Sequence, residues 1–418
     1  MNEKNPEEIV YRRKAFKLFD QGKSVTQIRR LIPRSRAWVY KWKRRFAQQR
    51  WYALDSLPKA PHSSAHQYPQ GTVALVLRLR QHLARSSVGL LGARAIRQEV
   101  RRRHLLRVVP SLVTINRWLK QAGLLPTARL PGAAPYSPQP HLPENCGLLS
   151  CDWISRYLKG GEKPYALHPI DAQTHALCQT ISTDKTTAAL IHHILQAFTE
   201  LGLPDFLQLD KDGAFTNLGK NQRVFGRFLR VLLYLGVEPL FIPPGEPKRN
   251  SLLEGVNHLW AQSFFDKAHF TSVAQRKRRS PKFLSWYSRS APPRLGGLSV
   301  EEAKRGVKRR KLTAREQRSL PAHLPLTAGR IHFIRRVDER GEIHLLNESW
   351  KVSKRLVGEY GWATVDLAAQ HLLISDRKSD RAQAKRIKQY DYGGAEPVKR
   401  LLPQYRRRTR RVKVVEIM

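Results

Sequence analysis

The sequence predicts a multidomain protein: two all-α units, then a mixed α/β core, then a small β-barrel. Its 418 residues are too many for one ordinary domain. Two Pro-rich stretches interrupt the chain, and hydrophobic periodicity changes along it from helical to mixed and then to alternating. We expect the following parts: helical units at 1–57 and 68–127, a Pro-rich linker at 128–145, the core at 146–312, the barrel at 325–378 and a basic tail at 379–418.

The chain carries a large excess of positive charge. Its 76 Lys and Arg against 33 Asp and Glu leave a formal net charge of +43. This excess indicates a polyanionic partner and favours nucleic acid over a membrane surface. No run of about 18 apolar residues is present, which excludes a membrane-spanning helix. The charged N-terminus and three cysteines without a CxxC pair argue against export, a disulfide scaffold and structural zinc, so we expect a cytoplasmic, nucleoid-associated protein.

The first helical unit has the outline of a helix-turn-helix. Apolar residues recur at three- and four-residue steps from residue 7, Gly22 breaks this pattern, and Ser24 is a candidate N-cap for a second helix. The basic, aromatic stretch "RAWVYKWKRRF" predicts a third helix, which in this motif reads DNA. A small basic helical bundle without a DNA role is the alternative. The expected DNA-contacting side chains are Arg36, Tyr40, Lys43 and Arg44.

The same outline repeats in the second helical unit. "TVALVLRLRQHLAR" and "GARAIRQEVRRR" predict two helices. "SLVTINRWLKQAG" predicts a third, with Ser111 or Thr114 as its cap and Gly123 at its end. Two tandem units would let one chain hold an extended DNA site. The expected DNA-contacting side chains here are Thr114, Asn116, Arg117 and Lys120.

The core combines hairpin strands with helix–strand alternation. "GLLSCDWI", "YALHPIDAQ" and "HALCQTIS" are apolar runs at hairpin spacing and predict three antiparallel strands. A helix ("TTAALIHHILQAFTELG"), a strand ("FLQLD"), a helix ("LGKNQRVFGRFLRVLLYLG"), a strand ("VEPLFIPP") and a long helix ("SLLEGVNHLWAQSFFDKAHF") follow. This order predicts a mixed sheet with helices on both faces.

Short alternating strands begin at about Arg330, with "DERG" as a hairpin turn between the first two. They predict a small all-β barrel. The basic tail ends in "LLPQYRRRTRRVKVVEIM", and we expect it to be disordered without nucleic acid.

Three carboxylates stand out in the core. Asp152 lies at the inner end of the first strand, Asp210 ends the strand "FLQLD", and Glu254 lies in the first turns of the long helix. Ligands of α/β sheets bind at the carboxyl ends of the strands. Three anions there would repel one another unless divalent cations neutralise them, and Mg²⁺ or Mn²⁺ suits oxygen ligands. Two such ions, about 3.5–4 Å apart, stabilise the attacking and leaving oxygens of a phosphoryl displacement.

These motifs resemble a known family. "LLSCDWI", "LQLDKDGAF" and "FIPPGEPKRNSLLEGVNHLW" resemble the three carboxylate motifs of retroviral integrases and bacterial DDE transposases, among them the insertion-sequence enzymes, whose catalytic core is of the ribonuclease H type. Tandem helix-turn-helix units before the core and a small β-barrel after it extend the resemblance over most of the chain. Lys211 stands where the family often has Asn, and Ser251 where it often has Gly. His258 is the nearest candidate for a basic residue that the family often has after the Glu.

The resemblance implies a DDE-type polynucleotidyl transferase with Asp152, Asp210 and Glu254 as catalytic and metal-binding residues. Such an enzyme hydrolyses the phosphodiester at a transposon end and then transfers the 3′-OH to target DNA. It implies double-stranded DNA and a homo-oligomer on that DNA as partners, and leaves room for an accessory ATPase. Two alternatives stay open: a domesticated DNA-binding protein acting as a repressor or architectural factor, and a ribonuclease H-like nuclease.

Several neighbouring residues have simpler interpretations. Asp212 occupies the glycine position of the motif, so we expect Asp210 to be the ligand and Asp212 to shape the turn. We expect Asp171 to be structural or solvent-facing, and Glu246 is a weaker alternative to Glu254. Other expectations concern packing: one of His192 and His193 in the core, Asn250 capping or orienting the long helix, and Trp260, Phe264 and Phe265 in helix packing.

Overall fold

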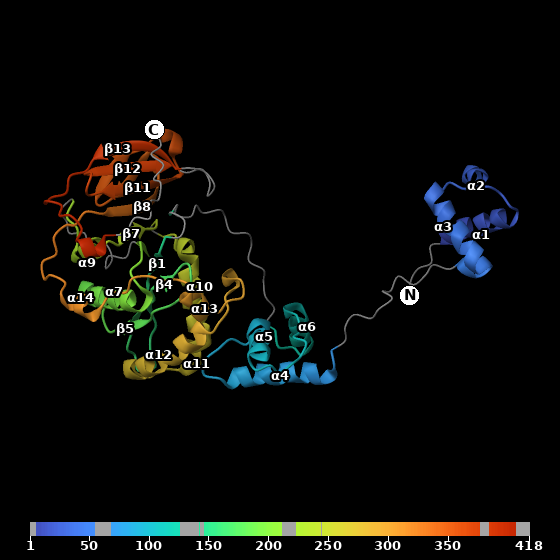
Figure 1. Ribbon diagram of the computed structural model, residues 1–418, viewed down its shortest axis with the longest axis horizontal. Helices are drawn as coiled ribbons and strands as arrows, with labels where there is room; N and C mark the ends of the chain where they lie inside the picture. The colour runs from blue at the N-terminus through green and yellow to red at the C-terminus, as the bar shows by residue number, and fades with distance from the viewer. Residues whose placement is uncertain are drawn as a thin grey trace. The chain divides into compact units, whose positions relative to one another are not determined.

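The computed structural model describes residues 6–54, 68–125, 142, 146–210, 223–243, 245–376 and 384–406. The chain divides into two compact units, Met1–Gln70 and Gly71–Met418 (Figure 1). The expected linker at 128–145, except for residue 142, and Asp212 lie outside the described residues.

The first unit is built from three helices, as predicted: α1 (Pro6–Asp20), α2 (Val25–Leu31) and α3 (Arg36–Gln49), followed by a 3₁₀ turn at Arg50–Leu54. Ser24 caps α2 in a capping box, in which its hydroxyl accepts from Gln27 N and its own N–H donates to Gln27 Oε1. The fully buried Phe16 packs against Phe46 with ring centroids 4.8 Å apart. The unit therefore has an apolar core of its own.

The second unit begins with α4 (Gln70–Arg85), α5 (Ala93–Arg102) and α6 (Leu112–Gln121), which confirm the next three predicted helices. Of the two candidate caps for α6, Ser111 caps it, because its hydroxyl accepts from Thr114 N at 3.1 Å. Two hydrogen bonds join these helices to the core: Gly89 N donates to Ser263 O at 3.0 Å, and Gln98 Nε2 donates to Arg289 O at 2.6 Å.

The three antiparallel strands of the core are confirmed, but two of them are interrupted. The first is split into β1 (Leu148–Ser150) and β2 (Trp153–Ser155), and the second into β3 (Tyr165–Leu167) and β4 (Ile170–Asp171). β2, β3 and β5 (Thr180–Ser182) form a three-stranded antiparallel sheet, while β1 pairs antiparallel with β4. The break in the first strand falls at Cys151 and Asp152.

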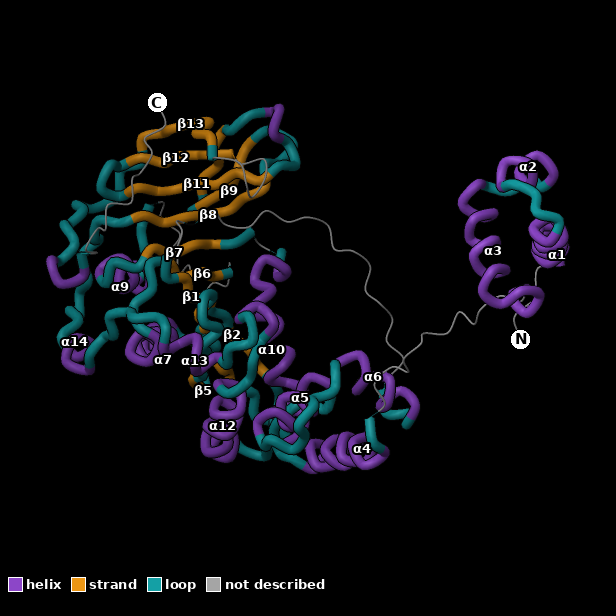
Figure 2. The backbone as a smooth tube through the Cα atoms, turned by 45° about the vertical axis from the view of Figure 1, so that its right-hand side comes forward, coloured by secondary structure: helices purple, strands orange, loops and turns teal. Residues whose placement is uncertain are grey.

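Two parallel strands and two helices follow. β6 (Phe206–Leu209) is parallel to β1, and β7 (Glu238–Phe241) is parallel to β6. α7 (Thr187–Leu201) and α9 (Arg227–Tyr234) precede them, and in Figures 1 and 2 both helices lie to one side of β6 and β7, with α10 to the other. The helix predicted from Leu218 is shorter than expected, since Gly226 is its extended N-cap and Arg223 has φ 61. Residues 218–222 are not among the described ones.

The predicted long helix is present with one irregularity. A 3₁₀ turn (Pro247–Asn250) leads into α10 (Ser251–Trp260), which continues through a π-helix (Ala261–Phe265) into α11 (Asp266–Ala268). Trp260 and Phe264 are buried, as expected for packing residues. Three more helices complete the core: α12 (Val273–Ser288), α13 (Val300–Arg305) and α14 (Ala314–Arg318). None of the helices in the described parts of the chain has the length and apolar composition needed to cross a bilayer.

The C-terminal strands correct the expectation of a separate barrel at 325–378. They are β8 (Arg330–Arg336), β9 (Glu342–Leu345), β10 (Glu348–Lys351), β11 (Tyr360–Asp366), β12 (His371–Asp376) and β13 (Lys385–Asp391). β8 pairs parallel with β7, so one eight-stranded sheet runs in the order β13-β12-β11-β8-β7-β6-β1-β4 (Figure 2). β9 and β10 form a hairpin beside it.

The expectation of a disordered tail from residue 379 is also corrected in part. β13 lies inside that range and pairs antiparallel with β12. Beyond it, Glu396 forms an ion pair with Arg230 of α9, and Tyr405 is buried. The chain after residue 379 therefore contributes to the fold as far as Arg406, the last described residue.

Because β8 covers one edge of β7, we predict that truncation after residue 320 leaves the core insoluble. Truncation would expose the backbone of β7 and the buried side chains of Leu240 and Phe241. Removal of residues 1–69 is the matched control, since that unit has its own core. Soluble yield and a cooperative thermal transition measure both. A truncated core that is soluble and melts cooperatively would contradict the continuous sheet.

Candidate active site

Strand pairing brings two of the three candidate carboxylates together. In the parallel β1–β6 ladder Leu149 pairs with Leu207 and Ser150 with Gln208, and Cys151 N donates to Gln208 O at 3.0 Å. Continuing this register by two residues sets Asp152 beside Asp210 at the carboxyl ends of the two strands. Both aspartates are half-buried.

Cys151, the residue between β1 and Asp152, is affected by the charges of both Asp152 and Asp210. Cys151 is fully buried, and burial is the main reason that the pKa of its thiol lies well above the usual value. The negative charges of Asp152 and Asp210 raise this pKa further. That effect requires both carboxylates to lie near one thiol, in agreement with the register. The Asp152 carboxylate is oriented by Trp153 N, which donates to its Oδ1 at 2.6 Å.

Two hydrogen bonds position the helix that carries Glu254. At its start, Gln208 Nε2 on β6 donates to Asn250 Oδ1 at 3.3 Å. One turn beyond Glu254, Asn257 Oδ1 lies 2.6 Å from His168 Nδ1, and His168 N donates to Asp152 O at 3.2 Å. Residues 250, 254 and 257 share one helix face, so Glu254 lies on the face that contacts β6 and the Asp152 strand. Its side chain is exposed.

Asn250 thus orients α10 without capping it, because its side chain makes no cap hydrogen bond. Gln208, His168 and Asn257 were not predicted as site residues. Gln208 could have been found from the sequence, since it stands two residues before Asp210 and therefore on the same side of the strand. The His168–Asn257 contact depends on how α10 packs, and no sequence pattern indicates it.

No group of three or more His, Cys, Asp or Glu side chains is placed to hold a metal ion among the described residues. Continuing the strand register therefore sets Asp152 beside Asp210, whereas the exposed Glu254 of α10 belongs to no ligand cluster among the described residues. The donor set still fits a hard divalent cation, since all three groups are carboxylates and two of them are adjacent.

The other acidic candidates have structural roles. Asp171 is buried, forms an ion pair with Arg309 and accepts from Gln173 N at 2.8 Å, so it is not solvent-facing. Glu246 is paired with Arg249 at 2.7 Å and accepts from the Tyr360 hydroxyl. A carboxylate already bonded in this way is a poorer metal ligand than the exposed Glu254.

The two neighbouring histidines of α7 differ, as expected. His193 is buried and His192 is exposed. Burial lowers the pKa of His193 to about 4, with a further contribution from the neighbouring His192. His193 packs edge-on against Trp153 with ring centroids 6.0 Å apart. It is a core residue under the strand that follows Asp152.

The expected DNA-contacting face of α3 is exposed. Its buried side is formed by Val39, Trp42 and Phe46. The Arg36 guanidinium lies 5.7 Å from the Tyr40 ring centroid and, as the main cause, lowers the pKa of the Tyr40 hydroxyl. The side chains of all four predicted residues, Arg36, Tyr40, Lys43 and Arg44, are exposed.

The predicted DNA-contacting residues of α6 differ in exposure. Asn116, Arg117 and Lys120 are exposed, whereas Thr114 is half-buried and its Oγ1 lies 2.9 Å from Ser111 Oγ, as part of the helix start. Val113 was missed: it is 78% exposed and stands three and four residues before Asn116 and Arg117, on the same face. An exposed valine beside polar groups suits contact with a thymine methyl group.

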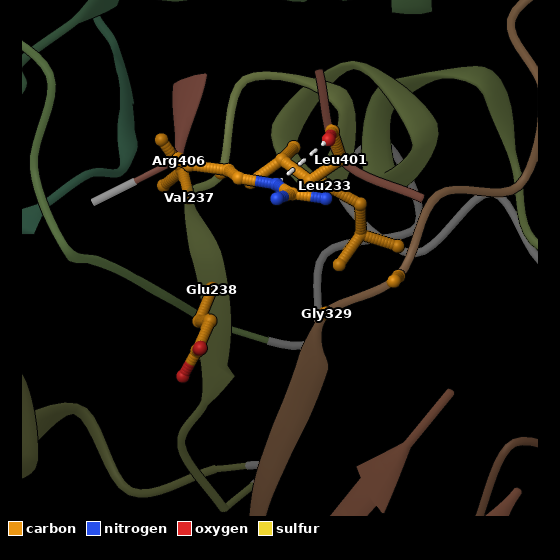
Figure 3. A pocket seen from close by; sticks show the side chains of 8 residues that line it. Leu233, Val237, Glu238, Gly329, Leu401 and Arg406 are labelled. Atoms are coloured by element: carbon orange, nitrogen blue, oxygen red, sulfur yellow. Dashed lines mark hydrogen bonds between the residues drawn. The ribbon is translucent and has the colours of Figure 1, made fainter. Parts of the chain in front are cut away.

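A cavity of about 280 Å³ lies elsewhere, at the seam between α9, β7 and the C-terminal segment. Figure 3 shows that Glu238 extends away from Arg406, whose Nε donates to Leu401 O at 3.4 Å. Glu238 begins β7 and pairs with Phe206, so the cavity is at the amino ends of the parallel strands. It is therefore at the opposite edge from Asp152 and Asp210.

Comparisons with known proteins found similarity to one retroviral polyprotein and to several solved structures. No family model matches the chain. A segment of 142 residues is 30% identical to the Gag-Pro-Pol polyprotein of Simian retrovirus SRV-1, covering 33% of this chain and 8% of the polyprotein. The sequence is therefore similar to a retroviral polyprotein. The chain spans about 8% of that relative's length.

Two solved structures are also similar. The HTLV-2 integrase catalytic core domain in complex with magnesium matches with 16% identity and a TM-score of 0.28, over 38% of this chain and 95% of that one. The simian T-cell lymphotropic virus intasome in complex with PP2A regulatory subunit B56 gamma matches with 13% identity and a TM-score of 0.34, over 74% and 98%. Both TM-scores are below 0.5.

The buried His168 predicts a specific pH dependence of stability. Burial lowers its pKa to about 4 from an ordinary value near 6.5. The neutral imidazole thus stabilises the fold above pH 6.5, and this contribution of about 3 kcal/mol is lost as the pH falls to 4. We expect His168→Gln to have a shallower decline in the free energy of unfolding than wild type over that range. Denaturant unfolding at several pH values measures it, and parallel profiles would contradict the assignment.

Proposed function

We propose that the protein is a DDE-type DNA integrase or transposase, which cleaves at element ends and joins the resulting 3′-OH to target DNA. The observation that supports this proposal is the β1–β6 register: continued by two residues past Ser150 and Gln208, it would set Asp152 beside Asp210 at the carboxyl ends of parallel strands. The third carboxylate of the proposal is Glu254 on α10, the helix that contacts Gln208 through Asn250 and His168 through Asn257.

In this proposal Asp152, Asp210 and Glu254 hold one or two Mg²⁺ or Mn²⁺ ions. The ions would polarise the scissile phosphate and lower the pKa of the attacking water or 3′-OH. The protein's own residues fix the carboxylates: Trp153 N orients Asp152, and Asn250 and Asn257 hold the helix of Glu254 over the sheet. Three fixed anions repel one another, and bound cations would offset that repulsion.

Affinity for DNA would come from the excess of basic residues. The exposed face of α3 in the first unit and the face of α6 with Val113, Asn116, Arg117 and Lys120 are the proposed reading surfaces. The match to a retroviral polyprotein supports the same class, and the similar HTLV-2 integrase core is a magnesium complex. Assembly of at least two copies on DNA follows from the need to join two ends, and assignment to the bacterial insertion-sequence enzymes stays a proposal.

The proposal predicts that each carboxylate is required for chemistry and not for binding. Asp152→Asn, Asp210→Asn and Glu254→Gln should bind DNA ends with unchanged affinity and lose strand transfer by at least about a thousandfold, because each removes a charge that holds the cation. A strand-transfer assay with Mg²⁺, on DNA carrying the sequences that flank the gene, measures this.

Asp212→Asn is the matched control, since it removes the charge two residues further along the sequence. We expect it to retain activity within about tenfold. Activity that survives in Asp210→Asn but is lost in Asp212→Asn would show that the wrong aspartate was chosen. Binding without joining by wild type would favour a domesticated DNA-binding protein, and cleavage confined to RNA–DNA hybrids would favour the nuclease alternative.

A further inference from the structure

The C-terminal strands contact two segments of the core, one that follows β6 and one between β7 and α10. One begins at Arg223, the first described residue after Asp210. The other joins β7 to α10, from Ile242 to Asn250, and is described except for residue 244. Side chains from β8, β10 and β11 reach these segments at three points.

The first contact is on the Arg223 segment. Glu348 of β10 accepts two hydrogen bonds from its guanidinium, from Nε at 3.0 Å and from Nη2 at 3.2 Å. This bidentate pair is oriented as well as attractive. The guanidinium also lies 4.9 Å from the ring centroid of the buried Tyr392, which follows β13. Arg223 is thus fixed between two C-terminal elements.

The second contact is at the end of β7. Arg335 of β8 is buried, and burial lowers the pKa of its guanidinium to about 10. Its Nη1 donates to Ile242 O at 3.1 Å and to Ile334 O at 2.8 Å, and its Nε donates to His344 O at 3.3 Å. A buried cation with carbonyl partners on three segments holds the first residue of the β7–α10 link in a defined place.

The third contact is on the turn before α10. The Tyr360 hydroxyl of β11 donates to Glu246 Oε1, while Arg249 Nε donates to Glu246 Oε2 at 2.7 Å. The Arg249 guanidinium lies 4.1 Å from the Tyr360 ring centroid and its side chain is fully buried. Burial and the Glu246 charge raise the pKa of Tyr360, so its hydroxyl stays a donor at neutral pH.

This third contact continues into the candidate site. Gln208 on β6 donates to Asn250 Oδ1 at 3.3 Å and to Arg249 O at 3.5 Å. Asn250 directly precedes α10, and Gln208 precedes Asp210 by two residues. An unbroken chain of contacts therefore runs from β11 through Glu246 and Arg249 to the strand of Asp210 and the helix of Glu254.

We propose that Arg335 and Tyr360 are positioning residues that hold the Ile242–Asn250 segment, so that the helix of Glu254 is set against the strand of Asp210. The inference rests on the proposed function for its catalytic consequence. A merely structural join between the core and the C-terminal strands is already supplied by the β7–β8 ladder and by the stacked Phe241 and Phe333 rings, 5.2 Å apart. The two polar contacts additionally orient the segment that leads into α10.

The test uses Tyr360→Phe in the full chain, because phenylalanine keeps the ring over Arg249 and removes only the hydroxyl. Asp366→Asn is the matched control, because it weakens the Arg330–Asp366 ion pair (3.0 Å) between β8 and β11, which does not contact the Ile242–Asn250 segment. Strand transfer, DNA affinity, the Mg²⁺ concentration for half-maximal rate and the thermal midpoint are measured for both variants and for wild type.

We expect Tyr360→Phe to lose about tenfold in the rate of strand transfer and to need several-fold more Mg²⁺, because small displacements of catalytic groups are costly. DNA affinity and thermal midpoint should match those of Asp366→Asn. Rates and Mg²⁺ dependence equal to those of the control would overturn the positioning role.

Hydrogen exchange separates this inference from the proposed function. Amides of Arg249–Asn257 should exchange faster in Tyr360→Phe than in Asp366→Asn, whether or not the protein joins DNA. If wild type has no strand-transfer activity, the proposed function fails and hydrogen exchange alone tests the positioning role. Faster exchange in Tyr360→Phe supports that role, and equal exchange in the two variants overturns it.

Discussion

The parallel pairing of β1 with β6 is the constraint on which the rest of the structure depends. This pairing joins the antiparallel part of the core to the parallel part. It ends at Ser150, the last residue of β1, two residues before Asp152. Cys151, which follows β1, is fully buried; burial is the main reason that the pKa of its thiol is raised, and the charges of Asp152 and Asp210 raise it further. A shift of one residue in this register would turn one aspartate to the opposite face of the sheet. The relative position of the two aspartates therefore depends directly on this register.

Much of the local structure could be predicted from the sequence, because it depends on patterns within a short window. Helical periodicity and the capping residues Ser24 and Ser111 identify helices of both N-terminal units. Asp210 at the end of a buried strand is found by the same reasoning. Which strands become neighbours is set by long-range packing, so the pairing of β7 with β8 was missed and the C-terminal strands were expected as a separate barrel.

The corrections have a common physical origin. Basic, alternating segments such as β13 carry little apolar signal, and they form strands because a neighbouring strand is available. Likewise Asn257 and Tyr360 act through partners far away in sequence, which no local motif specifies. As a result the C-terminal part of the chain is structurally continuous with the core, and the carboxylates lie in a frame to which both contribute. The exposure of the basic side chains on α3 and α6 depends on local helix periodicity, and it agrees with the sequence pattern.

The central claim is that the strand-end aspartates and Glu254 form a metal site for DNA chemistry. Anomalous X-ray diffraction from crystals of the protein with a DNA end and Mn²⁺ tests it most directly, since it locates the metal without relying on turnover. The account predicts anomalous peaks within about 2.0–2.6 Å of carboxylate oxygens of Asp152 and Asp210, with Glu254 drawn into the same site. Peaks at Glu246 or Asp171 instead, or no peak between the two strand ends, would contradict it.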